Sequence, residues 1–227
     1  MKKVAILQSN YIPWKGYFHI IQKVDYFVFL DSVQYTKRDW RNRNRIKTPT
    51  GLKWLSVPNN GSQSVTIEEV KIDNSRKWYE KHFRSLLGSY GKCKYFGDYY
   101  DFLKKTFLQT KWEYLSELNQ YLIKEISNFL GLPTIFCNSN EFELEREKND
   151  RLISILKQLQ ATYYLTGPSA KFYLNFEKFR KNGITVEIMN YPDYPIYRQP
   201  WGNFVHEVSI LDLLFCEGKN ASKFIWH

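Results

Sequence analysis

Two short apolar runs near the start of the chain, each followed by a polar residue, constrain the fold more than any other feature. Residues 4–7 are followed by Gln8, and residues 26–30 by Asp31. Runs of this length and composition are typical of parallel strands that are buried on both faces. Between them, residues 16–23 carry apolar side chains at helical spacing. The sequence therefore predicts a strand, a loop, a helix and a second, parallel strand.

The second half of the chain repeats this alternation of strand and helix. The patterns predict strands at residues 134–137, 163–165 and 185–188, and helices at residues 150–160 and 172–181. Alternating strands and helices of these lengths are typical of an α/β fold with a mostly parallel, doubly wound, Rossmann-like sheet.

A different pattern separates the two halves. Helical spacing predicts three helices at residues 78–90, 99–109 and 111–130, and Gly131 ends the last of them. Residues 52–57 and 65–72 resemble two strands joined by a turn-rich segment, which predicts a hairpin. We therefore expect a single domain over residues 1–227, with a helical segment of about residues 75–130 inserted in the α/β core.

The predicted topology brings two polar loops to one edge of the sheet. The loops after residues 7 and 30 follow neighbouring parallel strands, and open α/β sheets bind ligands at the carboxyl ends of their strands. Asp31 is a candidate for a general base or for a group that orients a substrate amine, although a turn-capping role is also open. The candidate binding residues in these loops are Gln8, Asn10, Tyr11, Trp14, Tyr17, Gln34 and Tyr35.

A basic cluster follows directly. The formal net charge of +10 suggests an anionic partner, such as a nucleotide, a nucleic acid or a phospholipid surface, although part of it is ordinary lysine-rich surface. Arginine supplies planar, bidentate donors for phosphate, and tryptophan supplies a stacking surface. The candidate binding residues in this cluster are Arg38, Trp40, Arg41, Asn42, Arg43 and Arg45.

Further candidates lie outside the first third of the chain. His82 on a predicted helix could act as a general base or could simply be buried, and Lys81 beside it is a candidate binding residue. A loop of small residues after the predicted strand 163–165 could hold phosphate through its backbone amides, or could be only a tight turn. Its candidate binding residues are Thr166, Gly167, Ser169 and Tyr173.

The sequence gives little support for secretion, membrane insertion, a metal site or a disulfide. Residues 4–7 are too short for the core of a signal peptide, and no stretch approaches the roughly 20 apolar residues of a membrane-spanning helix, so we expect a cytoplasmic protein without membrane insertion. The histidines at positions 19, 82, 206 and 227 have no metal-ligand spacing, and we expect no metal. Cys93, Cys137 and Cys216 lie far apart and are expected to be reduced, mostly structural thiols.

Several ordered motifs together resemble the WbqC-like protein family over almost the whole chain. The N-terminal motifs are Gln8, residues 11–18, residues 30–35, residues 40–46 and Trp54-Leu55. The match continues through Trp78, Lys81-His82, residues 163–170, Tyr173 and residues 209–215. One departure is Ser9, where the family often has proline. The start of the chain is also similar to nucleotidyltransferase-like folds, in which a His-x-Gly-His element opens the first helix. His19 is the one histidine that could take its place, and this similarity makes it a candidate catalytic residue.

The resemblance implies a role in bacterial O-antigen or other surface-polysaccharide synthesis. It implies a glycyl-type acyl or aminoacyl transferase that modifies the amine of a nucleotide-linked amino sugar. The acyl donor stays open among a charged transfer RNA, an acyl-coenzyme A and an amino acid activated by ATP, and no other cofactor is indicated. The alternative from the basic cluster is a non-catalytic nucleotide- or RNA-binding module, in which residues 38–45 bind phosphate.

Overall fold

A five-stranded, all-parallel sheet forms the centre of the molecule. The computed structural model describes residues 1–226, and in this part of the chain the strands lie in the order β5-β2-β1-β6-β7. Their bounds are β1 Lys3–Leu7, β2 Tyr26–Phe29, β5 Ile135–Asn138, β6 Tyr163–Thr166 and β7 Thr185–Ile188. All five strands overlap the ranges that the sequence predicts, and the α/β fold class is confirmed.

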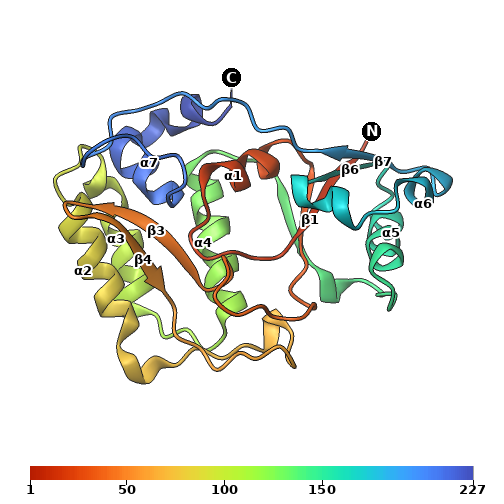
Figure 1. Cartoon of the computed structure of the whole chain (residues 1–227), viewed down its shortest axis with the longest axis horizontal. Helices are drawn as coiled ribbons and strands as arrows, with labels where there is room; N and C mark the ends of the chain where they lie inside the picture. The colour runs from red at the N-terminus through yellow and green to blue at the C-terminus, as the bar shows by residue number, and fades with distance from the viewer. Residues whose placement is uncertain (227) are drawn as a thin grey trace.

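Both faces of the sheet are covered by helices, as the apolar character of its strands requires. In β1, Val4 and Ile6 pack with α5 (Lys148–Gln158) and α6 (Phe176–Lys181), whereas Ala5 faces α1 (Lys15–Gln22) and α4 (Leu115–Phe129). Figure 1 shows α5 and α6 at one side of the molecule and α1 and α4 toward its middle. Helix α7 (Ile210–Glu217) joins the α1 side and closes the core there.

The inserted helical segment forms the other end of the molecule (Figure 1). It contains α2 (Trp78–Tyr90) and α3 (Tyr100–Lys104), and it leads into α4. The π-helical turn Lys105–Gln109 continues α3. The remaining short segments are 3₁₀ helices, at Ile67–Glu69, Asn74–Arg76, Phe96–Tyr99, Ser139–Glu141, Pro168–Phe172 and Gly218–Phe224.

The predicted hairpin is wrong in its partner strand. The antiparallel partner of β4 (Gly51–Ser56) is β3 (Arg43–Thr48), which belongs to the basic cluster. Residues 65–72 instead contain a 3₁₀ turn, because the side chain of Thr66 and that of Glu69 cap each other's backbone. In β3 the long polar side chains point to one face and Asn44 and Ile46 point inward, so the strand's alternation is concealed in a run of charged residues.

The strand order creates a topological switch point between β1 and β6. The chain runs from β1 outward to β2 and β5, then crosses back to β6 and continues outward to β7. In such sheets the connections on the two sides of the switch point lie on opposite faces, which leaves a crevice at the carboxyl ends of the two central strands. In residues 1–226, no helix is long and apolar enough to cross a membrane.

Candidate functional site

A cationic pocket occupies the crevice at the switch point. It has a volume of about 490 Å³ and lies beyond the carboxyl ends of β1, β2 and β6. We call it the cationic pocket because four basic side chains line it, namely Arg41, Arg146, Lys148 and Arg151. The other polar or aromatic lining residues are Gln8, Gln34, Tyr164, Ser169 and Tyr173. No acidic residue lines it in the described part of the chain, so the pocket is suited to an anionic ligand.

Five residues predicted from separate stretches of sequence meet in this pocket. They are Gln8, Gln34, Arg41, Ser169 and Tyr173. They come from the loops after β1, β2 and β6 and from the segment before β3. The three cations at the start of α5 were not predicted from the sequence. They face the pocket because α5 follows β5 and leads back to β6.

Arg41 is fixed in position by its neighbours. Its Nη2 donates to the side-chain oxygen of Gln8, and its Nη1 donates to that of Asn10 over 3.3 Å. Asp39 lies 3.3 Å from the same Nη1. The Asn119 amide also donates to the Arg41 carbonyl over 2.8 Å, so both the backbone and the side chain are held. An arginine oriented in this way loses little conformational entropy when it binds an anion.

At the other end of the pocket, Lys148 and Tyr173 contact each other. The Lys148 ammonium lies 3.3 Å from the centroid of the Tyr173 ring, which is a close cation–π contact. Burial raises the pKa of the Tyr173 hydroxyl, so this group stays a neutral hydrogen-bond donor near neutral pH. Phe172, the neighbouring residue, is 92% exposed. An exposed phenyl ring next to Tyr173 in the sequence offers a stacking surface for a planar ligand group.

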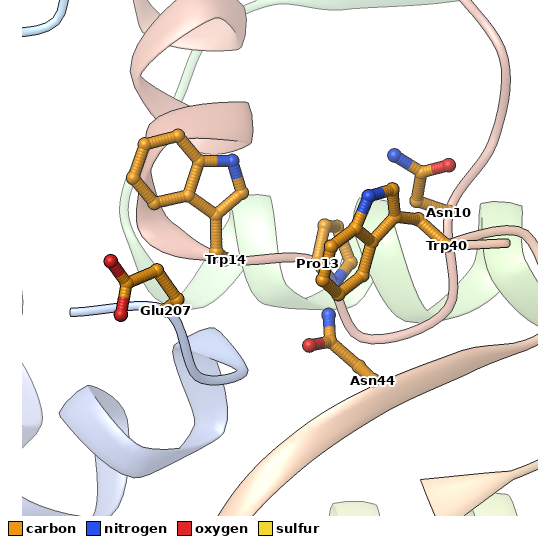
Figure 2. A pocket seen from close by; sticks show the side chains of 6 residues that line it. All are labelled: Asn10, Pro13, Trp14, Trp40, Asn44 and Glu207. Carbon is orange, nitrogen blue, oxygen red and sulfur yellow. The ribbon is translucent and has the colours of Figure 1, made fainter. Parts of the chain in front are cut away.

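An aromatic cleft lies on the other side of the Asn10–Arg41 contact. Its lining residues are Asn10, Pro13, Trp14, Trp40, Asn44 and Glu207 (Figure 2). In Figure 2, Asn10 lies on the Trp40 side of the cleft and Glu207 on the Trp14 side. Of these residues, Asn10, Trp14 and Trp40 were predicted as binding residues. The cleft is mostly apolar with a few polar groups, which is the usual composition of a small-molecule site.

Gly16 permits the position of Trp14. A Cβ atom at Gly16 would lie 2.2 Å from the Trp14 indole, a distance that real structures do not tolerate. The indole also packs edge-on against Tyr191, with ring centroids 5.0 Å apart. Gly16 therefore allows the Trp14 indole to pack closely against the backbone at the start of α1.

The rest of the basic cluster lies on the β3–β4 hairpin. The guanidinium groups of Arg43 and Arg45 lie 4.4 Å and 5.6 Å from the ring of Trp54. Trp40 contacts the same indole, with ring centroids 5.6 Å apart. Trp40 and Trp54 are 44% and 43% exposed, so this cation–aromatic surface faces solvent. Arg38 is exposed with a left-handed φ of 56°, and Asn42 donates to the Val57 carbonyl.

Asp31 is a buried carboxylate whose oxygens are occupied by donors. It accepts from the Ser9 amide over 2.8 Å, from the Ser116 hydroxyl over 2.5 Å and from the Gln120 amide over 3.1 Å. Its side chain is 2% exposed and does not line the cationic pocket. These contacts join the loops after β1 and β2 to α4. A catalytic role for Asp31 stays a prediction, and its observed geometry is that of a structural support.

His82 and Tyr11 form a second buried pair. The Tyr11 hydroxyl lies 2.7 Å from Nδ1 of His82, and both side chains are buried beneath the hairpin. Burial lowers the pKa of His82 to about 3, although a hydrogen bond with the Ser56 backbone acts to raise this pKa. Burial also raises the pKa of Tyr11, so Tyr11 donates to a neutral imidazole. Neither residue lines the cationic pocket or the aromatic cleft.

Three other predicted residues also support the loops from within the core. His19 contacts the Tyr194 hydroxyl over 2.9 Å. Tyr17 donates to the Gln8 carbonyl over 2.9 Å, and Tyr35 accepts from the Asn59 amide over 3.1 Å. All three side chains are buried.

The remaining predicted residues have varied positions. Lys81 is exposed on α2. Thr166 is buried at the end of β6, and Gly167 is the N-cap of the 3₁₀ helix Pro168–Phe172. No group of His, Cys, Asp and Glu side chains that could hold a metal ion occurs in residues 1–226, and His227 lies outside the described residues.

The start of α5 carried only a weak sequence signal. Arg146, Lys148 and Arg151 alternate with acidic residues, so the stretch resembles an ordinary solvated helix. The position of α5 in the topology could have indicated these cations, because the first turn of a helix that follows a parallel strand lies at the carboxyl edge of the sheet. Glu207, which lies just before the helix-capping motif at residues 209–212, also lines the cleft.

Comparisons with known proteins agree with the resemblance seen in the motifs. The model of the WbqC-like protein family matches residues 8–224. The uncharacterized protein Rv1507c of Mycobacterium tuberculosis is 44% identical over 227 residues, which cover 99% of this chain and 98% of that protein. No solved structure matches the chain. From the family match and this full-length similarity, we conclude that the chain belongs to the WbqC-like protein family.

Proposed function

We propose that this protein is a glycyl-type acyl or aminoacyl transferase that acts on the amine of a nucleotide-linked amino sugar. One observation carries the proposal: a pocket with four cations and no described acid lies at the switch point of a parallel sheet, next to an aromatic cleft. Membership of the WbqC-like family gives the proposal its biological setting, the synthesis of bacterial O-antigen or another surface polysaccharide. The proposed location is the cytoplasm, where nucleotide-linked sugars are made.

The cationic pocket is suited to the diphosphate of such a substrate. Arg41 and Arg151 bring positive charge to phosphate oxygens, and Lys148 adds a compact charge. The Nε and Nη2 of Arg151 also donate to the carbonyls of Glu145 and Arg146, which hold this side chain in place. The pocket gathers these groups from the segment before β3 and from α5. A diphosphate bound there would be held from two sides of the crevice.

Aromatic surfaces flank the proposed diphosphate site. Phe172 is almost fully exposed beside Tyr173, and Trp14 and Trp40 line the cleft beyond Asn10. Planar bases stack on such rings, and the apolar faces of sugars pack on them. The nucleoside and the amino sugar would then occupy opposite sides of the diphosphate.

The proposed reaction needs an activated acyl donor, which is a thioester, an oxygen ester or the acyl phosphate of an amino acid activated by ATP. The sugar amine attacks the carbonyl carbon of the donor, and a new C–N bond forms. The C–S or C–O bond of the donor breaks, and the amine proton ends on the departing thiolate, alkoxide or phosphate. Asp31, His82 and His19 stay as predicted catalytic groups, and Glu207 adds a carboxylate at the lining of the aromatic cleft that could accept the proton.

Ligand binding is the first test of this function. A nucleotide-linked 3-amino or 4-amino sugar should raise the melting temperature of the protein, and the same sugar phosphate without the nucleotide should raise it less. Incubation with glycine and a cell extract should then add the mass of one glycyl residue to the sugar. A nucleotide sugar that changes neither melting temperature nor mass would contradict the proposal.

The β3–β4 hairpin supports a second candidate function, the binding of RNA without catalysis. Trp40 and Trp54 are exposed, and the latter lies beside Arg43 and Arg45, an arrangement that suits stacked bases and phosphates. If the acyl donor is a charged transfer RNA, the same surface could serve the transferase. This candidate predicts transfer RNA binding that weakens steeply with salt.

Two variants separate these candidates. The triple variant Arg43→Ala, Arg45→Ala and Trp54→Ala should lose RNA binding and keep the response to the nucleotide sugar. Arg151→Ala should do the reverse, because Arg151 lines the cationic pocket and not the hairpin. Loss of both activities in both variants would contradict two separate surfaces.

A further inference from the structure

Two of the three cysteines lie together, although they are 123 positions apart in the sequence. The Sγ atoms of Cys93 and Cys216 are 4.0 Å apart. The backbone fixes this proximity, because the Tyr95 amide donates to the Phe215 carbonyl over 3.1 Å. The Cys93 amide in turn donates to the Tyr90 carbonyl over 2.8 Å at the end of α2. The two thiols are therefore held close by the fold of the chain around them.

The packing around the pair leaves little freedom in the backbone. A Cβ atom at Gly218 would lie 2.5 Å from the Tyr95 ring, so the segment after α7 passes directly against the segment after α2. Gly218 also has a φ of 55°, which favours glycine. The close contact between these two segments therefore fixes the distance between Cys93 and Cys216.

A cavity gives solvent access to the pair. It has a volume of about 530 Å³, and both cysteines line it and are partly exposed. Three basic side chains, Lys92, Lys94 and Arg198, line the same cavity, against one acidic residue, Glu217. The cavity therefore favours a thiolate and attracts anionic reagents of modest size.

The two thiols are not equivalent. The hydrogen bond from Cys216 lowers the pKa of Cys93, whereas donation of that bond together with burial raises the pKa of Cys216. Cys93 is therefore the thiol that ionises first and attacks. Burial raises the pKa of the third cysteine, Cys137, which makes it the less reactive reference in the same chain.

We propose that Cys93 and Cys216 form a redox-active dithiol, which a small anionic disulfide such as oxidised glutathione converts reversibly into a Cys93–Cys216 disulfide. The Cys93 thiolate attacks one sulfur of the reagent, forms a mixed disulfide and releases one thiolate. Cys216 then attacks the Cys93 sulfur, the mixed S–S bond breaks, and the second thiolate leaves with the Cys216 proton. Two protein thiols are oxidised and one disulfide is reduced to two thiols.

The cross-link would join the end of α2 to the end of α7. Gln199, which lines the same cavity, also binds Lys47 and Asp212, so the dithiol lies beside the contacts that attach α7 to the hairpin. A bond across such a long stretch of sequence restricts the unfolded chain strongly. The oxidised protein should therefore melt at a higher temperature than the reduced one, by roughly 5 °C or more.

The test titrates the full-length protein with oxidised glutathione and measures its thiols and its mass. We expect two of the three thiols to disappear together, the mass to fall by that of two hydrogen atoms, and digestion to yield a Cys93–Cys216 linked peptide. A thiol reductant should reverse all three changes. Stable glutathione adducts without the linked peptide, or thiols that all persist, would overturn the proposal.

Matched variants locate the effect. Cys137→Ser should leave the oxidation and the rise in melting temperature unchanged. Cys93→Ser should abolish both, and Cys216→Ala should halt the reaction at a mixed disulfide on Cys93. If Cys216→Ala does not fold, the linked peptide from the wild-type chain still decides the proposal. An equal rise in melting temperature in Cys93→Ser would contradict it.

Discussion

The Nη1 of Arg41 donates to the side-chain oxygen of Asn10 over 3.3 Å, and this hydrogen bond joins the cationic pocket to the aromatic cleft. Arg41 lines the pocket and Asn10 lines the cleft. A ligand with both a phosphate group and an amino sugar that reaches both sides of this hydrogen bond would contact both cavities. Many classes of anionic ligand could bind a basic pocket. The neighbouring aromatic cleft narrows the class of ligand to one that also carries an aromatic or sugar group.

Loss of Arg151 should weaken the binding of a nucleoside diphosphate strongly. Arg151 lines the cationic pocket, and a hydrogen bond to a charged group contributes about 1.5–3 kcal/mol, so Arg151→Ala should raise Kd roughly 10- to 100-fold. Calorimetric titration with a nucleoside diphosphate would measure this change. Lys157→Ala is the control, since Lys157 is exposed on the same helix and does not line the pocket. Equal losses in the two variants would indicate a general effect of net charge.

The glycine beside Trp14 gives a prediction about the cleft. Gly16→Ala would place a Cβ within 2.2 Å of the indole, so the ring must move, and we expect a loss of about 1–3 kcal/mol in the free energy of unfolding. Gly88→Ala is the control, because a Cβ at Gly88 would have no neighbouring atom within 4 Å and alanine favours the helix α2. Urea denaturation of both variants would measure the difference. A Gly16→Ala variant as stable as Gly88→Ala would contradict the close packing.

The parallel sheet could be predicted because its strands are buried on both faces. Residues such as Val4 and Ala5 pack into different cores on the two sides, which requires continuous apolar runs that stand out in the sequence. Strand β3 could not be found in the same way. Arg43 and Arg45 hold their charged ends at the surface over Trp54, so the strand resembles a loop of basic residues.

The candidate site was predictable where its residues lie in the loops near the start of the chain. Gln8, Asn10 and Arg41 were predicted as binding residues, and Arg41 donates to both of the others. The contribution of α5 was not predictable from composition, because alternating acidic residues hide its cations. The contacts of Asp31 could not be predicted either, because Ser116 and Gln120 lie 85 and 89 residues away in sequence.

Buried His82 should make the protein less stable in mild acid. Burial lowers its pKa from 6.5 to about 3, so the unfolded chain binds a proton below pH 6.5 that the native state cannot bind. The free energy of unfolding therefore falls as the pH falls through 6.5, and this one group contributes a loss of about 2 kcal/mol at pH 5. His82→Gln should remove that part of the difference between pH 7 and pH 5, as measured by urea denaturation.

Tyr11→Phe provides the control for the histidine. It removes the hydroxyl that lies 2.7 Å from Nδ1 but leaves the imidazole buried and titratable. Tyr11→Phe should therefore lower stability at both pH values and keep the difference between them. A His82→Gln variant with the wild-type pH dependence would show that other groups cause it.

Asp31 offers a test that separates a structural role from a catalytic one. Its carboxylate accepts from the Ser9 amide, the Ser116 hydroxyl and the Gln120 amide, so Asp31→Asn would turn an N–H donor toward at least one of these donors. We expect the free energy of unfolding to fall by about 2–3 kcal/mol. Asp25→Asn is the control, because Asp25 is exposed and accepts a single bond, from the Lys3 amide, and we expect a much smaller loss.

Product formation by Asp31→Asn completes the comparison. If Asp31 only supports the loops, activity should fall together with the binding of the nucleotide sugar, since the loop that carries Gln8 and Asn10 is displaced. If Asp31 is the base predicted from the sequence, the variant should bind the sugar with nearly the wild-type Kd and form no product. Because the carboxylate is 2% exposed, a catalytic role also requires α4 to move away from it. Hydrogen exchange at Ser116 and Gln120 with and without the nucleotide sugar would detect that movement, and unchanged protection would favour the structural role.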